Sequence, residues 1–341
     1  MLKKLIGLSF VFFIGIYYIP IYWEQRAVEA PQSNAQTLET LAFSKSSQDQ
    51  ILPVRGFEHY IGKPTADFIE RYGAADHIGQ NDDGSQWWVY QESEDQYKQI
   101  EVKDNHIQSL FVLGEGVNTG PFRVKMTRDN IYDEVELSRH FNFKYQGLTY
   151  YLSLSNQEWQ DFPLVQFENN SFVILLFHPR SEEVYGLRYV SYESLLKLNI
   201  LSIGTEEDEI LDSYLPTLTS EQSEAEKEAQ LTYFINYMRQ QENLSALEAP
   251  PELETLTQEM IEKRDINDLT FAEDVQEGVI FVSGEYVYDP PMLFSQMLIN
   301  PAFQERLYRD DVRYISIEVH ENDVLVALFS DEELEVLQND Y

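Results

Sequence analysis

An uncharged, apolar run from Leu5 to Trp23 is the first strong pattern along the chain. As a helix rising ~1.5 Å per residue, it is just long enough to cross a hydrocarbon layer of ~30 Å. Two lysines precede the run and aromatic side chains gather at its far end, which favours a helix with a cytoplasmic amino end. The alternative is a cleaved signal peptide, but its best cleavage site, after Ala30, is followed directly by Pro31. We therefore expect residues 1–26 to be a retained transmembrane anchor.

Polar stretches and segments of regular hydrophobic spacing alternate along the rest of the chain. Residues 27–55 are rich in Ser, Gln, Ala and Thr, and we expect a linker that lifts the body off the membrane. A folded region is expected over residues 56–203, then an acidic linker over 204–230, and a second folded region over 231–341. A chain of 341 residues is long enough for two domains.

Within residues 56–203 the pattern is a helix followed by strands, and it occurs twice. In the first unit Thr65–Tyr72 has helical spacing, with Thr65 as the expected cap and Gly73 as the stop. The second unit opens with a helical patch over Asn130–Leu137. A helix plus an antiparallel meander, repeated, predicts an α+β domain of two related units. The expected strands are Trp87–Tyr90, Tyr97–Val102, Ile107–Leu113, Phe141–Tyr145, Thr149–Leu154, Leu164–Phe167, Phe172–Phe177 and Val184–Val190.

Helices and strands also mix in residues 231–341, but without the rhythm of parallel β-α-β units. The last two expected strands are joined by a short polar turn and predict a hairpin. This mixture predicts an α-β-α sandwich. The expected helices are Leu231–Gln241, Pro251–Arg264 and Pro291–Met297, and the expected strands are Val279–Ser283, Tyr314–Val319 and Val324–Phe329.

Charge and cysteine content narrow the classes of partner. The chain has 59 Asp and Glu against 24 Lys and Arg, a formal net charge of -35. Such a body is repelled by phosphate backbones, so we expect no nucleic-acid partner. The chain has no cysteine, which excludes disulfides, thiol nucleophiles and a lipid-modified cysteine anchor. A cysteine-free body outside a membrane favours the surface of a Gram-positive bacterium.

Four motifs of the last region occur in a recognisable order. They are Asn236–Leu247, Glu252–Met260, Asn300–Leu307 and Ile315–Val319. In these motifs the region resembles the CAP superfamily, which comprises cysteine-rich secretory proteins, antigen five and plant pathogenesis-related proteins, in its bacterial form. The third motif is similar to the family's Ser-Pro-Gly-His-Arg-x-Asn-Ile-Leu segment, and the fourth to the strand that follows it.

Residues 56–203 resemble the CAP-associated N-terminal domain. The motifs that carry this resemblance are Gly62–Pro64, Trp87–Tyr90 and Val102–Ile107. An anchor, an associated domain and a CAP domain in this order are known from Gram-positive surface proteins. The resemblance thus implies the same domain order as the hydrophobic pattern.

The resemblance also implies a cleft in which two His and acidic residues can hold a divalent metal, but the matching positions are changed. Leu256 and Phe303 stand where the two His are expected. Gly278 stands where a Glu is expected, and a shift of one residue would bring Glu277 there. Leu and Phe can neither ligate a metal nor carry a proton. We therefore expect a degenerate, apolar cleft with no metal and no other cofactor.

No other motif of the sequence predicts catalysis. The six His are scattered, and no His-Glu-x-x-His, nucleophile elbow or phosphate-binding loop occurs. Trp87, Trp88, Tyr90 and Tyr97 lie on neighbouring expected strands and form a candidate aromatic binding surface. Because adjacent residues of a strand face opposite sides, one Trp is expected in the core and the other is a candidate to stack on sugar or peptide. Ordinary packing within the sheet is the favoured interpretation.

These observations predict a single-pass cell-membrane protein with its body outside the cell. We expect that body to bind a protein, peptide or cell-wall partner without catalysis. Two alternatives stay open at this point. One is an enzyme or a binder of a small peptide or lipid that works through the CAP cleft, and the other is a structural spacer in a cell-surface complex.

Overall fold

The computed structural model describes residues 51–341, except 94, 199, 206–219, 263–278, 284–287, 321–322 and 341. All the described residues belong to one compact unit. The anchor predicted for residues 1–26, and the linker up to residue 50, lie outside the described residues. No helix within the described part combines the length and the apolar character needed to span a membrane.

A seven-stranded antiparallel sheet forms the centre of the first region, in the order β1-β2-β3-β4-β9-β8-β7. The two predicted units meet in this sheet, because β4 pairs with β9 through Leu110 and Tyr189. All the strands predicted for the first unit are present, and β1 was not predicted. The strands are β1 (His77–Gln80), β2 (Gln86–Gln91), β3 (Tyr97–Lys103), β4 (His106–Leu113), β7 (Leu164–Phe167), β8 (Ser171–Phe177) and β9 (Val184–Ser191).

The second unit is not the single meander that was predicted. Two of its strands leave the main sheet and form a three-stranded sheet with β10, in the order β10-β6-β5. The prediction was wrong here because short alternating runs fix the strands but not their partners. These strands are β5 (His140–Tyr145), β6 (Leu148–Ser153) and β10 (Ile203–Thr205).

Short helices cover the edges and faces of this first region. The first α-helix begins after Pro64 without a side-chain cap, so the prediction of Thr65 as the cap was wrong. Gly73 ends it with a positive φ of 80°, as predicted. The helices are η2 (Phe57–Tyr60), α3 (Thr65–Tyr72), α4 (Arg128–Glu134), α5 (Asn156–Asp161) and α6 (Tyr192–Leu198).

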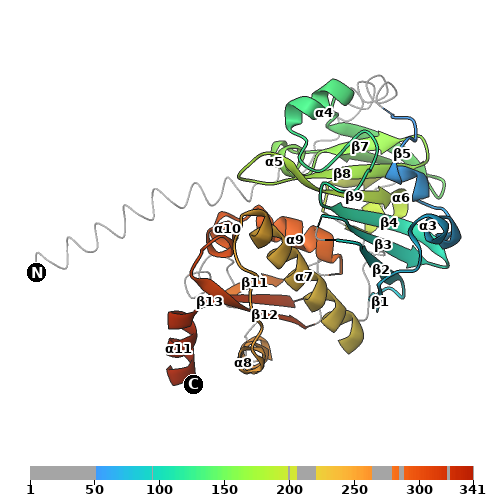
Figure 1. Cartoon of the computed structure of the whole chain (residues 1–341). Coiled ribbons are helices and arrows are strands. Elements are labelled where there is room, and N and C mark those ends of the chain that lie inside the picture. Colours follow the sequence, from blue (N-terminus) through green and yellow to red (C-terminus); the bar gives the residue numbers. More distant parts are fainter. Residues whose placement is uncertain are drawn as a thin grey trace, which may run out of the picture. The chain divides into compact units, whose positions relative to one another are not determined.

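The last region is an α-β-α sandwich around a three-stranded sheet in the order β11-β13-β12. The predicted hairpin is confirmed, since β12 and β13 pair antiparallel from Val312–Ser330 to His320–Asp323. Helices α7, α9 and α10 lie on one side of this sheet and α8 and α11 on the other (Figure 1). The elements are α7 (Glu221–Gln241), α8 (Pro251–Glu262), β11 (Val279–Ser283), α9 (Pro290–Leu298), α10 (Pro301–Leu307), β12 (Val312–His320), β13 (Asp323–Ser330) and α11 (Asp331–Asp340).

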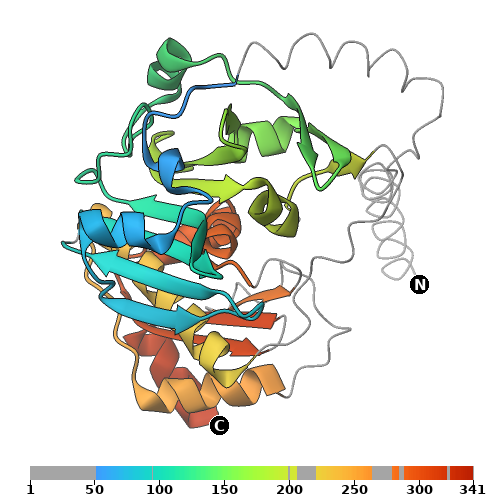
Figure 2. The same ribbon diagram turned by 90° about the vertical axis from the view of Figure 1, so that its right-hand side faces the viewer.

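Helices α7 and α9 lie between the seven-stranded sheet and the β11-β13-β12 sheet, and they join these two sheets into one core (Figures 1 and 2). The ring of Phe234 on α7 lies 5.3 Å from Phe111 on β4, and Phe294 on α9 lies 6.3 Å from Tyr185 on β9. A single cluster of buried apolar residues therefore runs from the seven-stranded sheet to the three-stranded sheet. The two folded regions expected from the sequence pack as one body.

Helix α7 begins at Glu221, well inside the stretch 204–230 that was expected to be a linker. Its first turns are polar, yet Lys227 is buried and its ammonium lies 2.5 Å from the Asp82 carboxylate in the turn before β2. Asp82 also accepts a hydrogen bond from the Ser223 hydroxyl. The prediction of a linker was wrong for these residues, because buried polar partners on a distant segment hold them.

Candidate functional site

Phe303, one of the two positions expected in a degenerate cleft, lies in the apolar core. It stands in the first turn of α10, where the Asn300 side chain accepts hydrogen bonds from the N–H groups of Ala302 and Phe303. The ring is 0% exposed and meets the ring of Phe294 edge-on at 6.4 Å. A side chain enclosed in this way offers nothing to a ligand.

Position 256 lies on the other side of the three-stranded sheet. Helix α8, which carries it, packs on β12 through a hydrogen bond between the hydroxyls of Thr257 and Ser316. Leu253 of α8 packs with Leu325 and with other residues of the same face of β13. The opposite face of β13, which includes Val326, belongs to the core that contains Phe303.

The expectation that Leu256 and Phe303 line one cleft is therefore corrected. Their helices cover opposite faces of a sheet, because successive residues of β13 point to opposite sides. Glu277 and Gly278, the other expected cleft positions, lie outside the described residues. The sequence motifs gave the order of these helices but not the side of the sheet on which each one packs.

The candidate aromatic surface is not formed, since three of its four members are buried, and the ordinary packing within the sheet that the sequence favoured is found instead. Trp87 is 1% exposed, and Tyr90 and Tyr97 are each 2% exposed. Tyr90 packs against Phe68 of α3, while Tyr97 stacks on Tyr233 of α7 at 4.6 Å. Trp88 is half-buried and packs against the core on its side of the sheet. Helices cover both faces of β2 and β3, so alternation along the strand leaves no open aromatic face.

Within the described part of the chain, no three His, Asp or Glu side chains gather as a metal site. The buried charges instead pair with each other across the two regions. Arg188 of β9, which is 0% exposed, lies 2.6 Å from Asp289 at the start of α9. Near this pair, burial raises the pKa of Glu101, against the opposing effect of Arg188. These groups join elements of the two regions.

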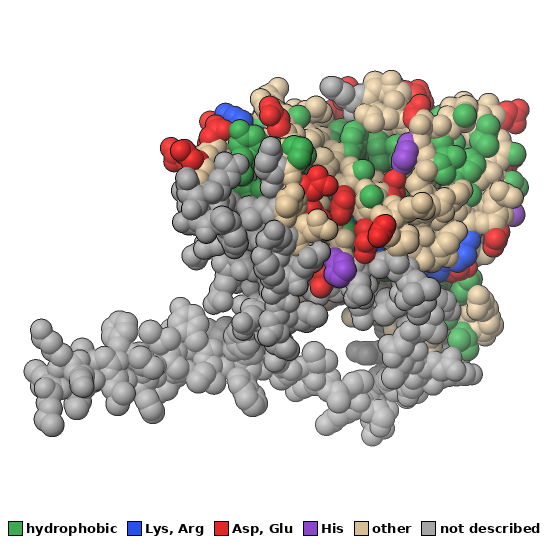
Figure 3. Space-filling view, turned by 90° about the horizontal axis from the view of Figure 1, so that it is seen from below, with side chains coloured by type: hydrophobic (Ala, Val, Ile, Leu, Met, Phe, Trp, Pro, Cys, Tyr) green, Lys and Arg blue, Asp and Glu red, His purple; other side chains and the backbone are tan. Residues whose placement is uncertain are grey.

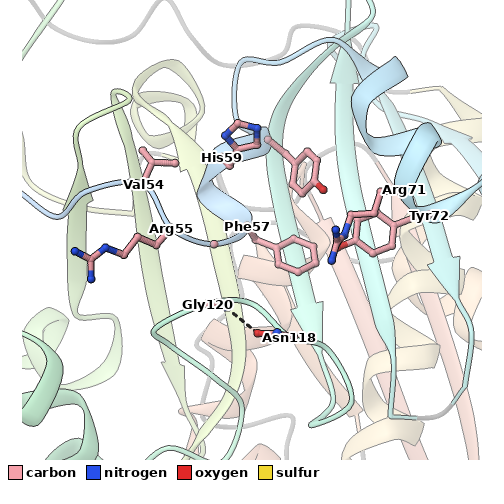
Figure 4. A pocket seen from close by; sticks show the side chains of 10 residues that line it. Val54, Arg55, Phe57, His59, Arg71, Tyr72, Asn118 and Gly120 are labelled. Carbon is pink, nitrogen blue, oxygen red and sulfur yellow. Dashed lines mark hydrogen bonds between the residues drawn. The ribbon is translucent and has the colours of Figure 1, made fainter.

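A surface pocket of about 420 Å³ is formed where η2 and the end of α3 meet the loop at Asn118. Ten residues line it, and Figure 4 shows their side chains. They are Val54, Arg55, Gly56, Phe57, His59, Tyr60, Arg71, Tyr72, Asn118 and Gly120.

Two glycines let the backbone segments of the pocket approach each other. A Cβ on Gly56 would lie 2.1 Å from the carbonyl oxygen of Thr119, and one on Gly120 would lie 2.7 Å from the Cα of Gly56. Gly120 also has a φ of +100°, which residues with side chains rarely adopt. The N–H of Phe57 donates to the same Thr119 oxygen at 3.2 Å. These contacts fix the segment that carries Arg55.

Aromatic rings form the floor of the pocket. Phe57 and Tyr72 stack at 5.8 Å, and Tyr60 meets Tyr72 at 6.1 Å. Beneath them, Phe68 is fully buried and lies 4.9 Å from Tyr60. Burial, and then the neighbouring Tyr72, raise the pKa of the Tyr60 hydroxyl, so this group stays a neutral hydrogen-bond donor.

Basic side chains flank this floor. Arg55 lies at one end of the pocket and Arg71 at the other, with the ring of Phe57 between them and the Arg71 guanidinium beside the ring of Tyr72 (Figure 4). The Nε of Arg71 donates to the Tyr72 hydroxyl at 3.1 Å, a hydrogen bond that raises the pKa of Arg71. Among the described residues the side chains of Arg55 and His59 form no hydrogen bond or ion pair. The pocket therefore offers free donors to a ligand.

No Asp or Glu lines the pocket, although the protein is strongly acidic. Glu58 belongs to the same segment, but it is 0% exposed and turned inward. Its Oε1 accepts hydrogen bonds from the N–H groups of Arg55 at 2.5 Å and Gly56 at 2.6 Å. Elsewhere, acidic side chains are spread over the described surface, as on the face in Figure 3. The pocket is thus an exception to the charge of the molecule.

Sequence reasoning missed this pocket because it treated Gly56 as the start of the fold and Tyr72 as the end of a helix. The signal that could have found it is the spacing of Phe57, Tyr60, Phe68 and Tyr72, with Arg55 and Arg71 beside them. The eighteen positions from Arg55 to Tyr72 hold four aromatic residues and three cationic ones, the third being Lys63.

Comparison with known proteins places this geometry in context. Residues 61–201 match the family model described as CAP-associated N-terminal. The described fold is similar to that of an extracellular protein containing a SCP domain from Bacillus anthracis str. Ames, with a TM-score of 0.68 and 19% identity over 81% of this chain and 95% of that one. A cysteine-rich secretory protein from Staphylococcus aureus subsp. aureus Mu50 gives a TM-score of 0.67 and 18% identity over 82% of this chain and 94% of that one.

A curated relative shares a shorter segment. The uncharacterized membrane protein YlbC of Bacillus subtilis (strain 168) is 26% identical over 115 residues, which are 34% of this chain. The match spans about a third of that relative, 33% of its length. The family match starts at Ile61, so Arg71, Tyr72, Asn118 and Gly120 of the pocket lie within it and the residues from Val54 to Tyr60 directly precede it.

Proposed function

We propose that this protein is a membrane-anchored binding protein. The proposal is supported by the match of residues 61–201 to the CAP-associated N-terminal family and by the similarity of the described fold to SCP-domain proteins. The protein is anchored in the cell membrane with its body outside, and it binds a partner there without catalysis. The CAP-like part is a packed scaffold. The pocket of the CAP-associated domain is the binding site.

The uncharged run from Leu5 to Trp23 and the lysines before it support the anchor and its orientation. A relative is named as a membrane protein, and a solved protein of similar fold is described as extracellular. A cysteine-free chain is also consistent with a surface where no disulfide is needed.

One observation carries the non-catalytic part of the proposal. Phe303, at the position where the family resemblance implies a cleft His, is 0% exposed and packs against Phe294. The second position, 256, stands on a helix that covers the opposite face of the sheet. A metal or a proton relay would need both positions to face one polar space.

The pocket is the better candidate for binding because its donors are unoccupied and its floor is aromatic. Ligand pockets combine apolar walls with a few convergent polar groups, and about 420 Å³ is within their usual size. Arg55, His59 and Arg71 supply the polar groups, and the half-buried rings of Tyr60 and Tyr72 supply the wall.

The test is the metal content and hydrolytic activity of the full chain, purified in a mild detergent without chelators. We expect substoichiometric zinc, manganese and nickel by mass spectrometry, and no cleavage of a general peptide or ester substrate beyond a heat-denatured control. A stoichiometric metal whose removal abolishes such cleavage would contradict the proposal and favour an enzyme acting through the CAP-like part.

A further inference from the structure

We infer that the pocket between Arg55 and Arg71 binds a chain-like ligand that carries oxyanions, either carboxylates or phosphates, along its length. This inference rests on the proposed function, in which this pocket is the binding site. It adds the chemical class of the ligand and the residues that recognise it.

Positive charge in the pocket contrasts with the acidic character of the whole chain. The chain carries 59 acidic against 24 basic residues, so its field repels an anion from most of the surface. The pocket reverses this pattern, because two Arg and one His line it and no Asp or Glu does. Both Arg are exposed, and each planar guanidinium can hold a carboxylate or phosphate through two hydrogen bonds.

The two guanidinium groups of the pocket lie apart from each other. Arg55 and Arg71 lie at opposite ends of an aromatic floor and do not converge on one point (Figure 4). A chain with anionic groups at intervals can reach both, while its uncharged backbone packs on the half-buried ring of Tyr72, which stacks on the buried ring of Phe57.

A buried cation, Lys98, lies close to the Tyr72 ring of the pocket. The ammonium of Lys98 lies 5.1 Å from the centre of the Tyr72 ring, and Arg71 lies 5.6 Å from it. Lys98 is 2% exposed, so it cannot itself reach a ligand, and it pairs with Glu92 at 2.6 Å. Both cations therefore lie within reach of a cation–π interaction with the Tyr72 ring, which stabilises its position.

Nearby carboxylates do not block the site. Glu58 faces inward and is engaged by the N–H groups of Arg55 and Gly56, so it positions the segment instead of occupying the pocket. Asp67 and Glu70 belong to α3, but neither lines the pocket.

The experiment measures binding of two labelled probes to the full chain in a non-ionic detergent, by fluorescence anisotropy. One probe is a linear polyphosphate and the other an oligoglutamate of similar length. The variants are Arg55→Gln, Arg71→Gln and the double variant. Arg123→Gln is the matched control, since Arg123 is exposed and does not line the pocket.

We expect at least one probe to bind, with an affinity that falls as salt rises. Each pocket variant should weaken binding about tenfold and the double variant about a hundredfold, as expected for charge-assisted hydrogen bonds. The control should stay within about twofold of the wild type. A preference for polyphosphate assigns phosphate, a preference for oligoglutamate assigns carboxylate, and equal binding assigns oxyanions in general.

Two results would overturn the inference. One is the absence of binding by both probes. The other is an equal loss of affinity in Arg123→Gln and in the pocket variants, which would mean attraction by surface charge alone. If the pocket nevertheless forms crosslinks to a partner in cells, only the ligand class is wrong and the proposed binding site stands. Unchanged urea midpoints for the exposed Arg variants exclude misfolding as the cause of lost binding.

Discussion

Buried charged residues hold this molecule together where the two folded regions meet. The guanidinium of Arg188 lies in the sheet under the ring of Trp87, whose centre is 5.3 Å away, and its Nη2 donates to Asp289 at 2.6 Å. Its Nε and Nη1 have no hydrogen-bond partner among the described residues. Asp289 also caps α9 through the N–H of Met292. The pair therefore fixes the position of α9 on the seven-stranded sheet.

Removing the charge of Asp289 alone should be costly. Asp289→Asn keeps the cap on α9 but leaves the buried Arg188 without its paired carboxylate, which costs about 3–5 kcal/mol. The measurement is the urea unfolding midpoint of the full chain, followed by Trp fluorescence. The double variant Arg188→Met with Asp289→Asn should recover most of the loss.

The matched control for this prediction is an exposed pair of the same chemistry. Arg309 and Asp311 form a salt bridge in which both side chains are substantially exposed. Asp311→Asn should change the free energy of unfolding by less than about 0.5 kcal/mol. Equal effects of Asp289→Asn and Asp311→Asn would show that burial of Arg188 does not govern the stability of this contact.

At the scale of elements, a second contact joins the end of β8 to the end of α10. The Nδ1 of His178 accepts hydrogen bonds from the N–H groups of Arg180 at 3.2 Å and Ser181 at 3.3 Å. Its Nε2 therefore carries the proton and donates to the Tyr308 hydroxyl at 2.8 Å. Burial lowers the pKa of His178, because a charged ring would face two N–H donors in a dry site.

This contact predicts a dependence of stability on pH. The pKa of His178 is lower in the folded than in the unfolded chain. The contribution of His178 to the free energy of unfolding is therefore complete above the unfolded pKa of ~6.5 and is lost as the pH falls below that value. Glu242 and Glu183 raise the pKa of His178, while Lys125 and Arg180 lower it. His178→Gln should lose less stability than the wild type as the pH is lowered through this window.

The pH experiment compares urea midpoints on both sides of that window. His320→Gln is the control, because His320 is exposed at the end of β12 and should leave the wild-type dependence unchanged. Identical slopes for His178→Gln and the wild type would contradict the assignment of a neutral His178 in the folded chain.

The elements themselves differ in how far the sequence determines them. The continuous apolar run Val324–Phe329, joined to Tyr314–Val319 by a short polar turn, was enough to predict β13 and its hairpin with β12. The polar first turns of α7 were interpreted as a linker because their buried partners, such as Asp82 for Lys227, are 145 positions away in the chain. No local pattern contains such partners.

The candidate site shows the same limit. Strand-like runs of aromatic and β-branched residues placed Trp87 and Tyr97 on strands, but only tertiary packing shows that helices cover both faces of those strands. The motifs around Leu256 and Phe303 gave an order of helices without the side of the sheet. The pocket brings together η2, α3 and the loop at Asn118, which no single segment of sequence contains.

For the whole molecule, the proposed function requires that the folded body lies outside the cell. The chain has no cysteine, so a single introduced cysteine reports its own location. Gln157→Cys, on exposed α5, should react with a membrane-impermeant maleimide in intact cells. Lys4→Cys, before the apolar run, should react only after the membrane is permeabilised. The opposite pattern would reverse the orientation of the protein.

The proposed function requires that a partner contacts the pocket between Arg55 and Arg71 and not the region of residues 231–341. Its most direct test is a photo-crosslinking amino acid introduced in living cells at Asn118 in the pocket, at Glu305 on α10 and at Lys144 on β5, all of which are exposed. We expect a discrete light-dependent adduct from position 118 and none from position 305 or 144. An adduct from position 305 with none from 118 would contradict it.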